Sequence, residues 1–242
     1  MIDLNSTTAF ADRVNFFIDA AIDAQQDEKR IYLGGSFCGD PCERKIQYMY
    51  LAAQDQIERQ KFPARVKRIF ERGHVFEAMC RKWLSDAGFV FGKPGPGFSD
   101  FDGKFQGHED GVICGWDSRL GGDTCPVALP AVWEHKAMKD DQWKKLQKEK
   151  LKKFSSTYYG QVTMEMHYMK VPRTLFSATN ANTLEIYHEI ISYDAPEAEM
   201  IRAKVSRVFT ATKLGELLPR CTTDLAFYLC VYCPFRKPCW AQ

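Results

Sequence analysis

The sequence predicts an α/β fold in which helices flank a mixed central sheet. Two apolar stretches, near residues 103–116 and 127–138, are expected to form strands, and a hairpin-like pair is expected near 173–177 and 183–192. Helical periodicity precedes and follows these stretches, and packing helices against a sheet buries the apolar side of both. At 242 residues and 45% apolar composition, the chain can bury one large core. We therefore expect a single domain over residues 1–242.

The helices are predicted from apolar residues that recur at helical spacing. The first carries an apolar stripe, and Gly34 and Gly35 break the chain after it. A turn-rich segment from Gly92 to Gly97 separates the N-terminal helices from the strands. We find no internal repeat and no low-complexity linker. The stripe comprises Phe10, Val14, Phe17, Ile18, Ala21 and Ile22, and the helices are expected near 7–29, 43–60, 66–84, 140–154, 157–170 and 195–215.

The most informative motif pairs Asp110 with the tripeptide Glu134-His135-Lys136. Side chains alternate along a strand, so Glu134 and Lys136 project to one side and His135 to the other. If Asp110 comes from a neighbouring strand, two carboxylates converge to hold a hard cation such as Mg²⁺, and the lysine can steer a water or offset phosphate charge. The motif indicates metal-dependent phosphodiester cleavage. The alternative is a chance occurrence on a solvated strand edge.

Two helices extend this pattern. In the helix near 66–84, His74 and Glu77 are three residues apart and therefore share a face. Gly73 in the same helix suggests close approach by another backbone or a ligand, although a local bend is an equal alternative. In the helix near 157–170, Gln161 lies one turn from Glu165 and two turns from Tyr168. Core packing is the simpler explanation for the aromatic residues and methionines of that helix.

The nine cysteines give an independent argument. No apolar leader follows Met1 and no apolar run is long enough to span a bilayer, so a disulfide framework and a membrane location are not expected. Cys230, Cys233 and Cys239 are closely spaced in a loop-like tail and need a fourth ligand, from Cys38 or Cys42, to complete a tetrahedral or cubane site. Zinc and an iron–sulfur cluster both suit such a set. The remaining cysteines that we consider, Cys80, Cys114 and Cys125, are predicted to be ordinary buried thiols.

The order of the motifs resembles the PD-(D/E)XK nuclease superfamily, and within it the RecB-like branch. The resemblance implies a restriction-endonuclease-like fold. It implies that Asp110 and Glu134 bind Mg²⁺ or Mn²⁺ with help from His74 or Glu77, and that Lys136 is the catalytic lysine. It also matches Gln161 to the glutamine of the following helix. The branch usually carries Gln-x3-Tyr, whereas Glu165 occupies the tyrosine position here.

RecB-like nucleases of CRISPR adaptation, of the AddB subunit and of several phages bind a [4Fe-4S] cluster through one N-terminal cysteine and a C-terminal C-x2-C-x5-C. This chain is similar to them in that arrangement. The resemblance implies Cys42, Cys230, Cys233 and Cys239 as ligands, with Cys38 as the alternative to Cys42. It also implies a cluster-binding helical part, residues 1–60 and 215–242, and a catalytic core, residues 61–195. The cluster would join the two chain ends.

We therefore expect a metal-dependent DNA exonuclease that acts on the ends of single-stranded or processed double-stranded DNA. The resemblance allows roles in recombination, repair or CRISPR adaptation, with phage as a possible source. It also allows an annealing protein, a recombination protein or a CRISPR integrase as partner, and a cytoplasmic location in a bacterium or an infected host. The alternatives are an RNA nuclease and a non-catalytic nucleic-acid-binding protein with a four-cysteine zinc or iron–sulfur tail.

The net charge of +2 does not by itself indicate nucleic acid. Local basic clusters are more informative: they would suit a DNA backbone track, although a solvated helix face is the simpler explanation. No ATP-binding loop is present, so any helicase would be a separate chain. Aromatic residues near the groove, Trp143, Tyr158 and Tyr159, could stack bases, although core packing is the simpler explanation for at least some of them. The clusters comprise Lys61, Arg65, Lys67, Arg68 and Arg72, and the lysines at 139, 144, 145, 148, 150, 152 and 153.

Overall fold

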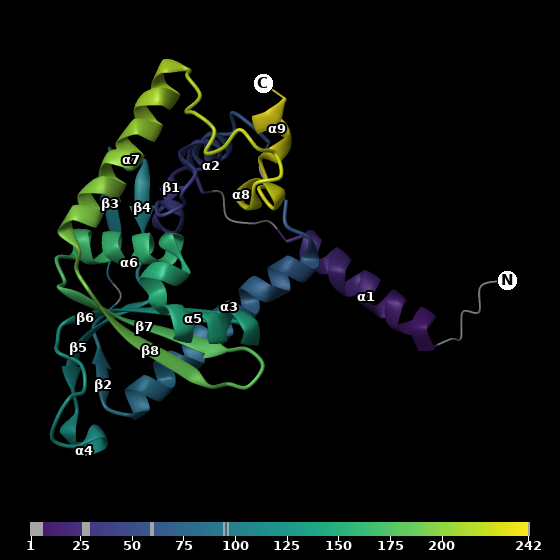
Figure 1. Cartoon of the computed structure of the whole chain (residues 1–242). Helices are drawn as coiled ribbons and strands as arrows, with labels where there is room; N and C mark the ends of the chain where they lie inside the picture. Colours follow the sequence, from purple (N-terminus) through teal and green to yellow (C-terminus); the bar gives the residue numbers. More distant parts are fainter. Residues whose placement is uncertain (1–6, 26–29, 59–60, 94, 96, 242) are drawn as a thin grey trace.

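A five-stranded mixed sheet forms the centre of the molecule (Figure 1). The computed structural model describes residues 7–25, 30–58, 61–93, 95 and 97–241. The strand order is β2-β5-β6-β7-β8, in which β6 and β7 are parallel and the other neighbours are antiparallel. The predicted mixed sheet with flanking helices is confirmed. The strands are β2 (Phe89–Phe91), β5 (Gly111–Trp116), β6 (Ala131–Met138), β7 (Arg173–Asn180) and β8 (Ile186–Ser192).

The stretch that we predicted as one strand near 103–116 is two strands in different sheets. β4 (Phe105–Gly107) joins β1 (Leu33–Gly34) and β3 (Phe98–Asp100) in a separate three-stranded sheet, whereas β5 enters the central sheet. β4 ends at Gly107. The Phe98 ring packs so closely there that a Cβ at this position would lie 2.3 Å from it, so the site requires glycine. The segment 108–110 between the two strands carries Asp110 to the start of β5.

Helices pack on both faces of the central sheet because β6 alternates apolar side chains between them. Val132 faces one core together with Leu146 and Val162, whereas Trp133 faces a second core together with Cys80 and Leu84. Two helices, α5 (Asp140–Phe154) and α6 (Ser156–Met169), therefore cover one face, and α3 (Ala64–Asp86) covers the other (Figure 1). A third core lies between α6, the small sheet, α2 (Glu43–Ala53) and α7 (Ala195–Leu214).

Several helix boundaries differ from those predicted. The second helix ends at Ala53 rather than near residue 60; residues 59 and 60 lie outside the described residues, as do 26–29 at the end of the predicted first helix. Within α5, Lys150 leaves helical geometry with φ 64° and ψ 160°, so the lysine-rich helix is broken there. The tail that we expected to be a loop contains two short helices, α8 (Tyr228–Val231) and α9 (Arg236–Trp240). A single helical turn, α4 (Ser118–Gly121), follows β5.

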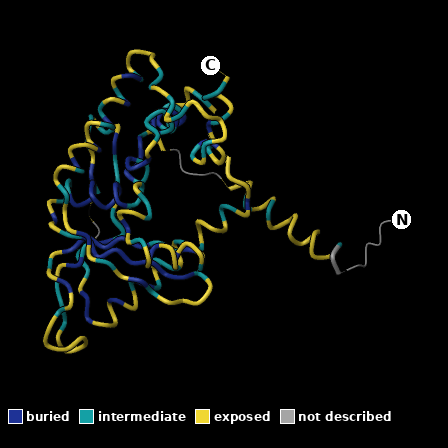
Figure 2. Tube along the Cα trace, in the orientation of Figure 1, coloured by how far each residue is buried: buried dark blue, intermediate teal, exposed yellow. Residues whose placement is uncertain are grey.

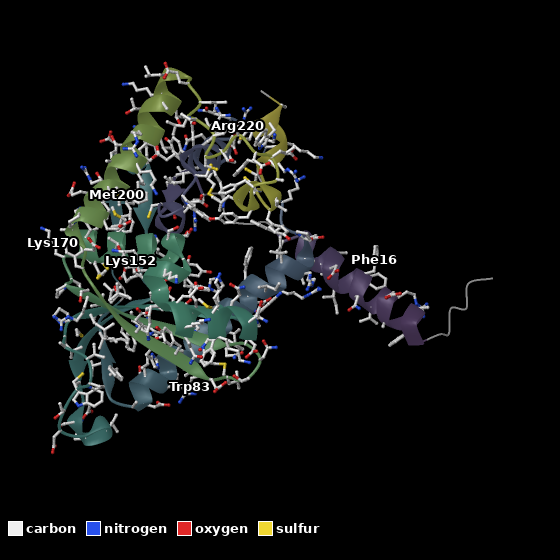
Figure 3. All side chains as sticks on the ribbon, viewed as in Figure 1. Phe16, Trp83, Lys152, Lys170, Met200 and Arg220 are labelled. Atoms are coloured by element: carbon white, nitrogen blue, oxygen red, sulfur yellow. The ribbon has the colours of Figure 1, made fainter. Side chains whose placement is uncertain are left out.

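The first helix, α1 (Thr7–Asp23), extends away from the body and contacts α3 (Figures 1 and 2). The sequence predicts its apolar stripe correctly, but the stripe does not enter a core. Phe17 is 69% exposed, and Phe16 on the same helix, labelled in Figure 3, is 68% exposed. None of the described helices is long and apolar enough to cross a membrane.

The two ends of the body pack against each other. On α2, Gln47 donates to the Glu216 carbonyl over 2.6 Å and accepts from the Leu218 N–H over 2.9 Å. The Tyr48 ring stacks on Phe235, with 5.4 Å between centroids. The expected proximity of the N-terminal helical part to the C-terminal tail is therefore present.

Candidate active site

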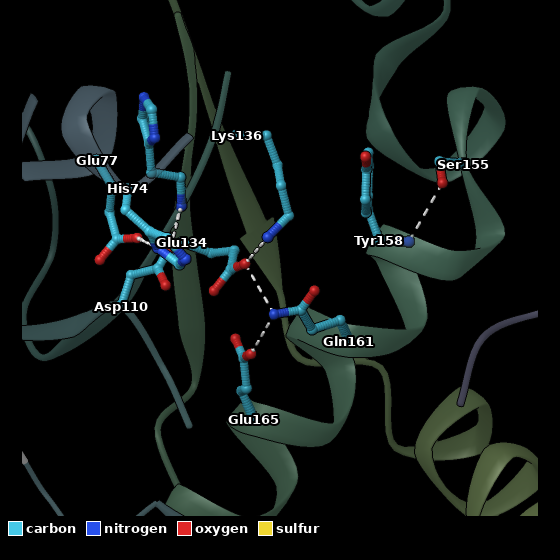
Figure 4. Close-up of polar contacts among 10 residues, drawn as sticks. His74, Glu77, Asp110, Glu134, Lys136, Ser155, Tyr158, Gln161 and Glu165 are labelled. Carbon is cyan, nitrogen blue, oxygen red and sulfur yellow. Dashed lines mark hydrogen bonds and ion pairs between the residues drawn. The ribbon is translucent and has the colours of Figure 1, made fainter. Parts of the chain in front are cut away.

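Asp110 and Glu134 are neighbours because of the strand register. β5 pairs antiparallel with β6, with Gly111 opposite Trp133, so Asp110, one residue before β5, lies opposite Glu134. The Asp110 Oδ2 atom accepts a hydrogen bond of 2.7 Å from the His135 backbone N–H. Asp110 is thus positioned by the sheet although it lies just outside the strand in which we expected it. Figure 4 shows the Glu134 carboxylate between Asp110 on one side and Lys136 and Gln161 on the other.

Alternation along β6 separates Glu134 and Lys136 from His135, as predicted. His135 Nε2 lies 2.9 Å from Thr179 Oγ1 on the opposite face, while Lys136 Nζ donates to Glu134 Oε1. Burial, opposed by the nearby Lys136, raises the pKa of Glu134 to about 7. Burial alone would lower the pKa of Lys136, but the Glu134 and Asp110 carboxylates outweigh it and raise the pKa. Lys136 therefore keeps its positive charge beside the two carboxylates.

Helix α6 adds two buried residues on one face. Gln161 Nε2 donates to Glu134 Oε1 over 2.8 Å and to Glu165 Oε1 over 2.9 Å (Figure 4). Glu165 is 2% exposed, and its burial, together with the Glu134 carboxylate, raises its pKa well above the usual range. Our sequence analysis did not assign Glu165 to the site. The i, i+4 spacing from Gln161 was the available signal.

Tyr168, the other candidate on α6, lies elsewhere. Its hydroxyl donates to Asp100 Oδ2 over 2.6 Å, and its ring stacks on Phe98 with 4.5 Å between centroids. It belongs to the third core with Met164. Tyr168 therefore has a packing role in this structure, in the small-sheet region.

Helix α3 brings His74 and Glu77 to the same cluster. His74 Nδ1 lies 3.7 Å from Glu77 Oε2, and the His74 side chain is 82% exposed. Burial, followed by the neighbouring Asp110 carboxylate, raises the pKa of Glu77. Arg81, on the next turns of α3, donates to the Asp110 carbonyl over 2.8 Å and links the helix to the strand end. The expected convergence of α3 with the strand carboxylates is present.

No other protein segment approaches Gly73 closely. Apart from the neighbouring residues and backbone of α3 itself, no heavy atom of the described residues lies within 4 Å of the position that a Cβ would take, and α3 continues through it as a helix. The glycine does not mark contact with another protein segment.

Three buried oxygen atoms in the cluster have no hydrogen-bond donor among the described residues: Glu134 Oε2, Gln161 Oε1 and Glu165 Oε2. An unpaired buried carboxylate is costly, and a cation removes that cost. Among the described residues, no group of three or more His, Cys, Asp or Glu side chains is arranged to hold a metal ion. Mg²⁺, however, usually binds through one or two carboxylates and keeps several waters. The donor chemistry at Asp110 and Glu134 therefore fits Mg²⁺ or Mn²⁺.

A second cluster lies at the other end of the body, where the four expected cysteines line one pocket. A fifth, Cys221, which our sequence analysis did not consider, also lines it. Burial, then a hydrogen bond and charge from Cys42, raises the pKa of Cys221 to about 12. Cys38 is instead fully buried in the third core with Ile46. The four expected cysteines are Cys42, Cys230, Cys233 and Cys239.

Basic side chains surround this pocket. Lys45 and Arg220 line it, Arg44 Nη1 lies 3.9 Å from Cys239 Sγ, and Arg220 donates twice to the Cys239 carbonyl at 2.9 and 3.1 Å. Positive charge favours thiolates over thiols.

Burial decides between base stacking and core packing for the aromatic residues, and it tests the prediction of buried thiols. Trp143 is 5% exposed and donates to the Ala178 carbonyl over 2.8 Å, and Tyr159 is 7% exposed, so neither ring is free to stack a base. Tyr158 is half-buried, with Lys136 Nζ 5.5 Å from its ring centroid. Cys80 is buried as expected, whereas Cys114 is exposed.

No protein-family model and no curated protein matches this sequence. Among solved structures, the chain is similar to an alkaline exonuclease (LHK-Exo) from Laribacter hongkongensis. The TM-score is 0.55 at 16% identity, covering 83% of this chain and 93% of that chain. For the structure of LHK-Exo in complex with dAMP, the TM-score is 0.52 at 15% sequence identity, covering 83% of this chain and 93% of that chain. The chain also aligns with SSO0001, with a TM-score of 0.48 at 13% identity over 96% of this chain and 98% of that chain. The chain thus has a fold similar to that of an alkaline exonuclease.

Proposed function

We propose that this protein is a Mg²⁺- or Mn²⁺-dependent deoxyribonuclease of the PD-(D/E)XK type, in its RecB-like branch, that degrades DNA from its ends. The observation that carries the proposal is the convergence of Asp110, Glu134, Lys136 and Gln161 from the start of β5, the interior of β6 and helix α6 (Figure 4). The buried, unpaired Glu134 Oε2 adds an atom that a cation would satisfy. The similarity of the fold to that of an exonuclease supports the reaction class.

Each residue has a distinct proposed role. Asp110 and Glu134 would hold the divalent cation, with Glu77 or His74 assisting from α3. The bound cation would neutralise the scissile phosphate and lower the pKa of a water. Lys136, which stays charged beside Glu134, would orient the attacking water and offset charge on the phosphate.

Substitutions at the cluster test the assignment. Asp110→Asn, Glu134→Gln and Lys136→Ala should each lower the rate of DNA cleavage by at least about 100-fold, because the loss of several kcal/mol of transition-state stabilisation has this effect. Circular dichroism and thermal melting should remain close to wild type for Asp110→Asn. Glu199→Gln, an exposed acidic position on α7, is the matched control and should cut normally.

Three outcomes would contradict the proposal. Wild-type protein with Mg²⁺ or Mn²⁺ that leaves all DNA and RNA intact but binds DNA would support a non-catalytic binding protein. Cleavage of RNA alone would make it a ribonuclease. Normal cleavage by the Asp110 and Glu134 variants would move the reaction to another site.

Attack from ends is tested with strand topology. We expect a linear single strand to be shortened progressively and a covalently closed circle to survive, because the proposed exonuclease acts only at a free end. Exposed lysines of α5, such as Lys145 and Lys148, would contact phosphates, so binding should weaken steeply with salt. Equal rates on circle and linear strand would identify an endonuclease.

We also propose that Cys42, Cys230, Cys233 and Cys239 bind a [4Fe-4S] cluster that joins the two chain ends. Their common pocket and its basic rim support this assignment. Anaerobically purified protein should be brown and contain about four iron atoms per chain. Serine at any of these positions should bleach it. A colourless protein with one zinc would favour a zinc site, and full iron retention in Cys42→Ser would transfer the fourth position to Cys221, which lines the same pocket.

Residues 1–60 and 215–242 would then form the cluster-binding part and 61–195 the catalytic core. DNA with free ends is the proposed substrate. An annealing protein, a recombination protein or a CRISPR integrase is the proposed class of partner, in recombination, repair or CRISPR adaptation within the cytoplasm of a bacterium or an infected host. Co-purification with each partner class tests the pathway.

A further inference from the structure

The position of Glu165 is unusual for a carboxylate. Its side chain is on the sheet-facing side of α6, the residue is 2% exposed, and Oε2 has no donor among the described residues. Its other oxygen, Oε1, accepts the 2.9 Å hydrogen bond from Gln161. A carboxyl group in such a place costs stability compared with an apolar side chain of similar volume. A contribution to stability therefore does not explain Glu165.

The hydrogen bond with Gln161 explains why a carboxyl group is buried at position 165. A primary amide has two N–H hydrogens, and Gln161 Nε2 directs its donors at Glu134 Oε1 and at Glu165 Oε1. Turning the amide over would place its carbonyl against both carboxylates. Glu165 thus favours one orientation of the Gln161 amide, which a single acceptor would define less strongly.

The orientation matters because of what it does to Glu134. With Gln161 and Lys136 both donating to Oε1, that oxygen is occupied, and Oε2 is left as the unpaired atom. The proposed function places a cation on Glu134. The arrangement directs the free oxygen of a fully buried carboxylate to that cation and keeps the other oxygen in place.

We propose that Glu165 is a positioning residue of the carboxylate site: it fixes the Gln161 amide, and through it the Glu134 carboxylate, for binding a divalent cation. The inference rests on the proposed function, since it concerns the metal affinity of Glu134. Glu165 itself touches neither metal nor substrate. Its effect passes through Gln161.

Two substitutions at one position separate positioning from charge. In Glu165→Gln, the new side-chain carbonyl can accept the same N–H from Gln161, so Mn²⁺ affinity should stay within about twofold of wild type. In Glu165→Met, the acceptor is lost and Mn²⁺ affinity should fall about 10- to 100-fold, as for other supports of metal ligands. Free Mn²⁺ is counted by electron paramagnetic resonance, with no turnover required. Because a buried, poorly paired carboxyl is removed, Glu165→Met should melt at or above the wild-type temperature.

A double-mutant cycle tests the route through Gln161. Gln161→Met should weaken Mn²⁺ binding as much as Glu165→Met, and the double variant should lose no more than either single variant. Glu199→Gln controls for removal of a carboxylate and should bind Mn²⁺ normally. For cleavage, kcat should fall in Glu165→Met while KM for DNA stays unchanged.

Wild-type Mn²⁺ affinity in Glu165→Met would overturn the inference and leave the proposed function intact. Equal losses in Glu165→Gln and Glu165→Met, with one fewer Mn²⁺ per chain, would make Glu165 a ligand and also overturn it. Additive losses in the cycle would overturn the route through Gln161. No Mn²⁺ binding by wild-type protein would instead defeat the proposed function itself, and the inference with it.

Discussion

The carboxylate site and the cysteine pocket are built with very different amounts of supporting structure. Glu134 and Gln161 are buried on long elements, β6 and α6, and the strand register fixes Asp110 opposite Glu134. The cysteine pocket is lined by residues of α8 and α9, of four and five residues, and helices this short are not stable alone. The first site is thus organised before any metal binds, whereas the second depends on a crosslink or on its contacts with α2.

The largest expected effect is at the cysteine pocket. If a cluster joins Cys42 to the tail, Cys230→Ser should lose iron and destabilise the fold by about 5 kcal/mol, the chain-entropy value for a crosslink that closes a loop of more than about 100 residues. Denaturant unfolding of wild type and variant under anaerobic conditions measures it.

Cys114→Ser, at an exposed position, is the control and should keep both iron and stability. Asp110→Asn should also keep iron, which separates the two sites. A Cys230→Ser variant as stable as wild type would mean that the tail does not depend on a crosslink.

The next effect is at the junction of the two regions. Gly39, before α2, packs on α6: a Cβ there would lie 2.1 Å from the Ser156 carbonyl oxygen, and one at Gly160 would lie 2.6 Å from Gly39 Cα. Gly39→Ala should therefore cost about 3 kcal/mol, since overpacking a tight contact requires the backbone to move. Chemical unfolding checks the value, and a neutral result would show that the α6 contact is adaptable.

Gly73→Ala is expected to stabilise the fold, in contrast to Gly39→Ala. The position is helical and open, with no heavy atom of the described residues near the added Cβ. The variant should be more stable by about 1 kcal/mol, which is the helix propensity difference between alanine and glycine. A loss of DNA cleavage without a loss of stability would show that substrate approaches α3 at this position.

The smallest expected effect is on pH dependence. Burial lowers the pKa of His188, on β8, below its usual 6.5, and Ser177 Oγ lies 2.9 Å from its Nδ1. As the pH falls, the His188 imidazole therefore becomes protonated in the unfolded chain before it does so in the folded protein. The free energy of unfolding decreases from about pH 6.5 towards the lower pKa of the folded protein. His188→Gln should flatten this part of the stability curve, measured by denaturant unfolding between about pH 7 and 5. An unchanged slope would mean that His188 has the same pKa in the folded and unfolded protein.

Much of the carboxylate site followed from local periodicity. Alternation along β6 placed Glu134 and Lys136 together, and helical spacing placed Gln161 near Glu165. These relations depend on the geometry of one element at a time. The α/β class followed in the same way, from the lengths and order of the apolar stretches.

Spacing within single elements could not predict which side chains are buried by segments that are distant in the sequence. The apolar stripe of α1 satisfies helical periodicity but extends from the body, and Trp143 enters the core instead of a groove. The stretch near 103–116 looks like one strand in sequence, yet β4 pairs with β1 while β5 pairs with β6. Strand pairing is decided by the partner, which is remote in the chain.

The sequence by itself therefore determined which side chains share a face, and so which acids and bases can act together: Glu134 with Lys136, His74 with Glu77, Gln161 with Glu165. The tertiary structure alone decided that these faces meet, that Glu165 is buried against the site and that Cys221 joins the cysteine pocket while Cys38 does not. The physical reason is the separation in sequence of the interacting residues. Backbone geometry fixes the spacing of side chains within one helix or strand, whereas contacts between elements depend on the packing of segments that are far apart in the sequence.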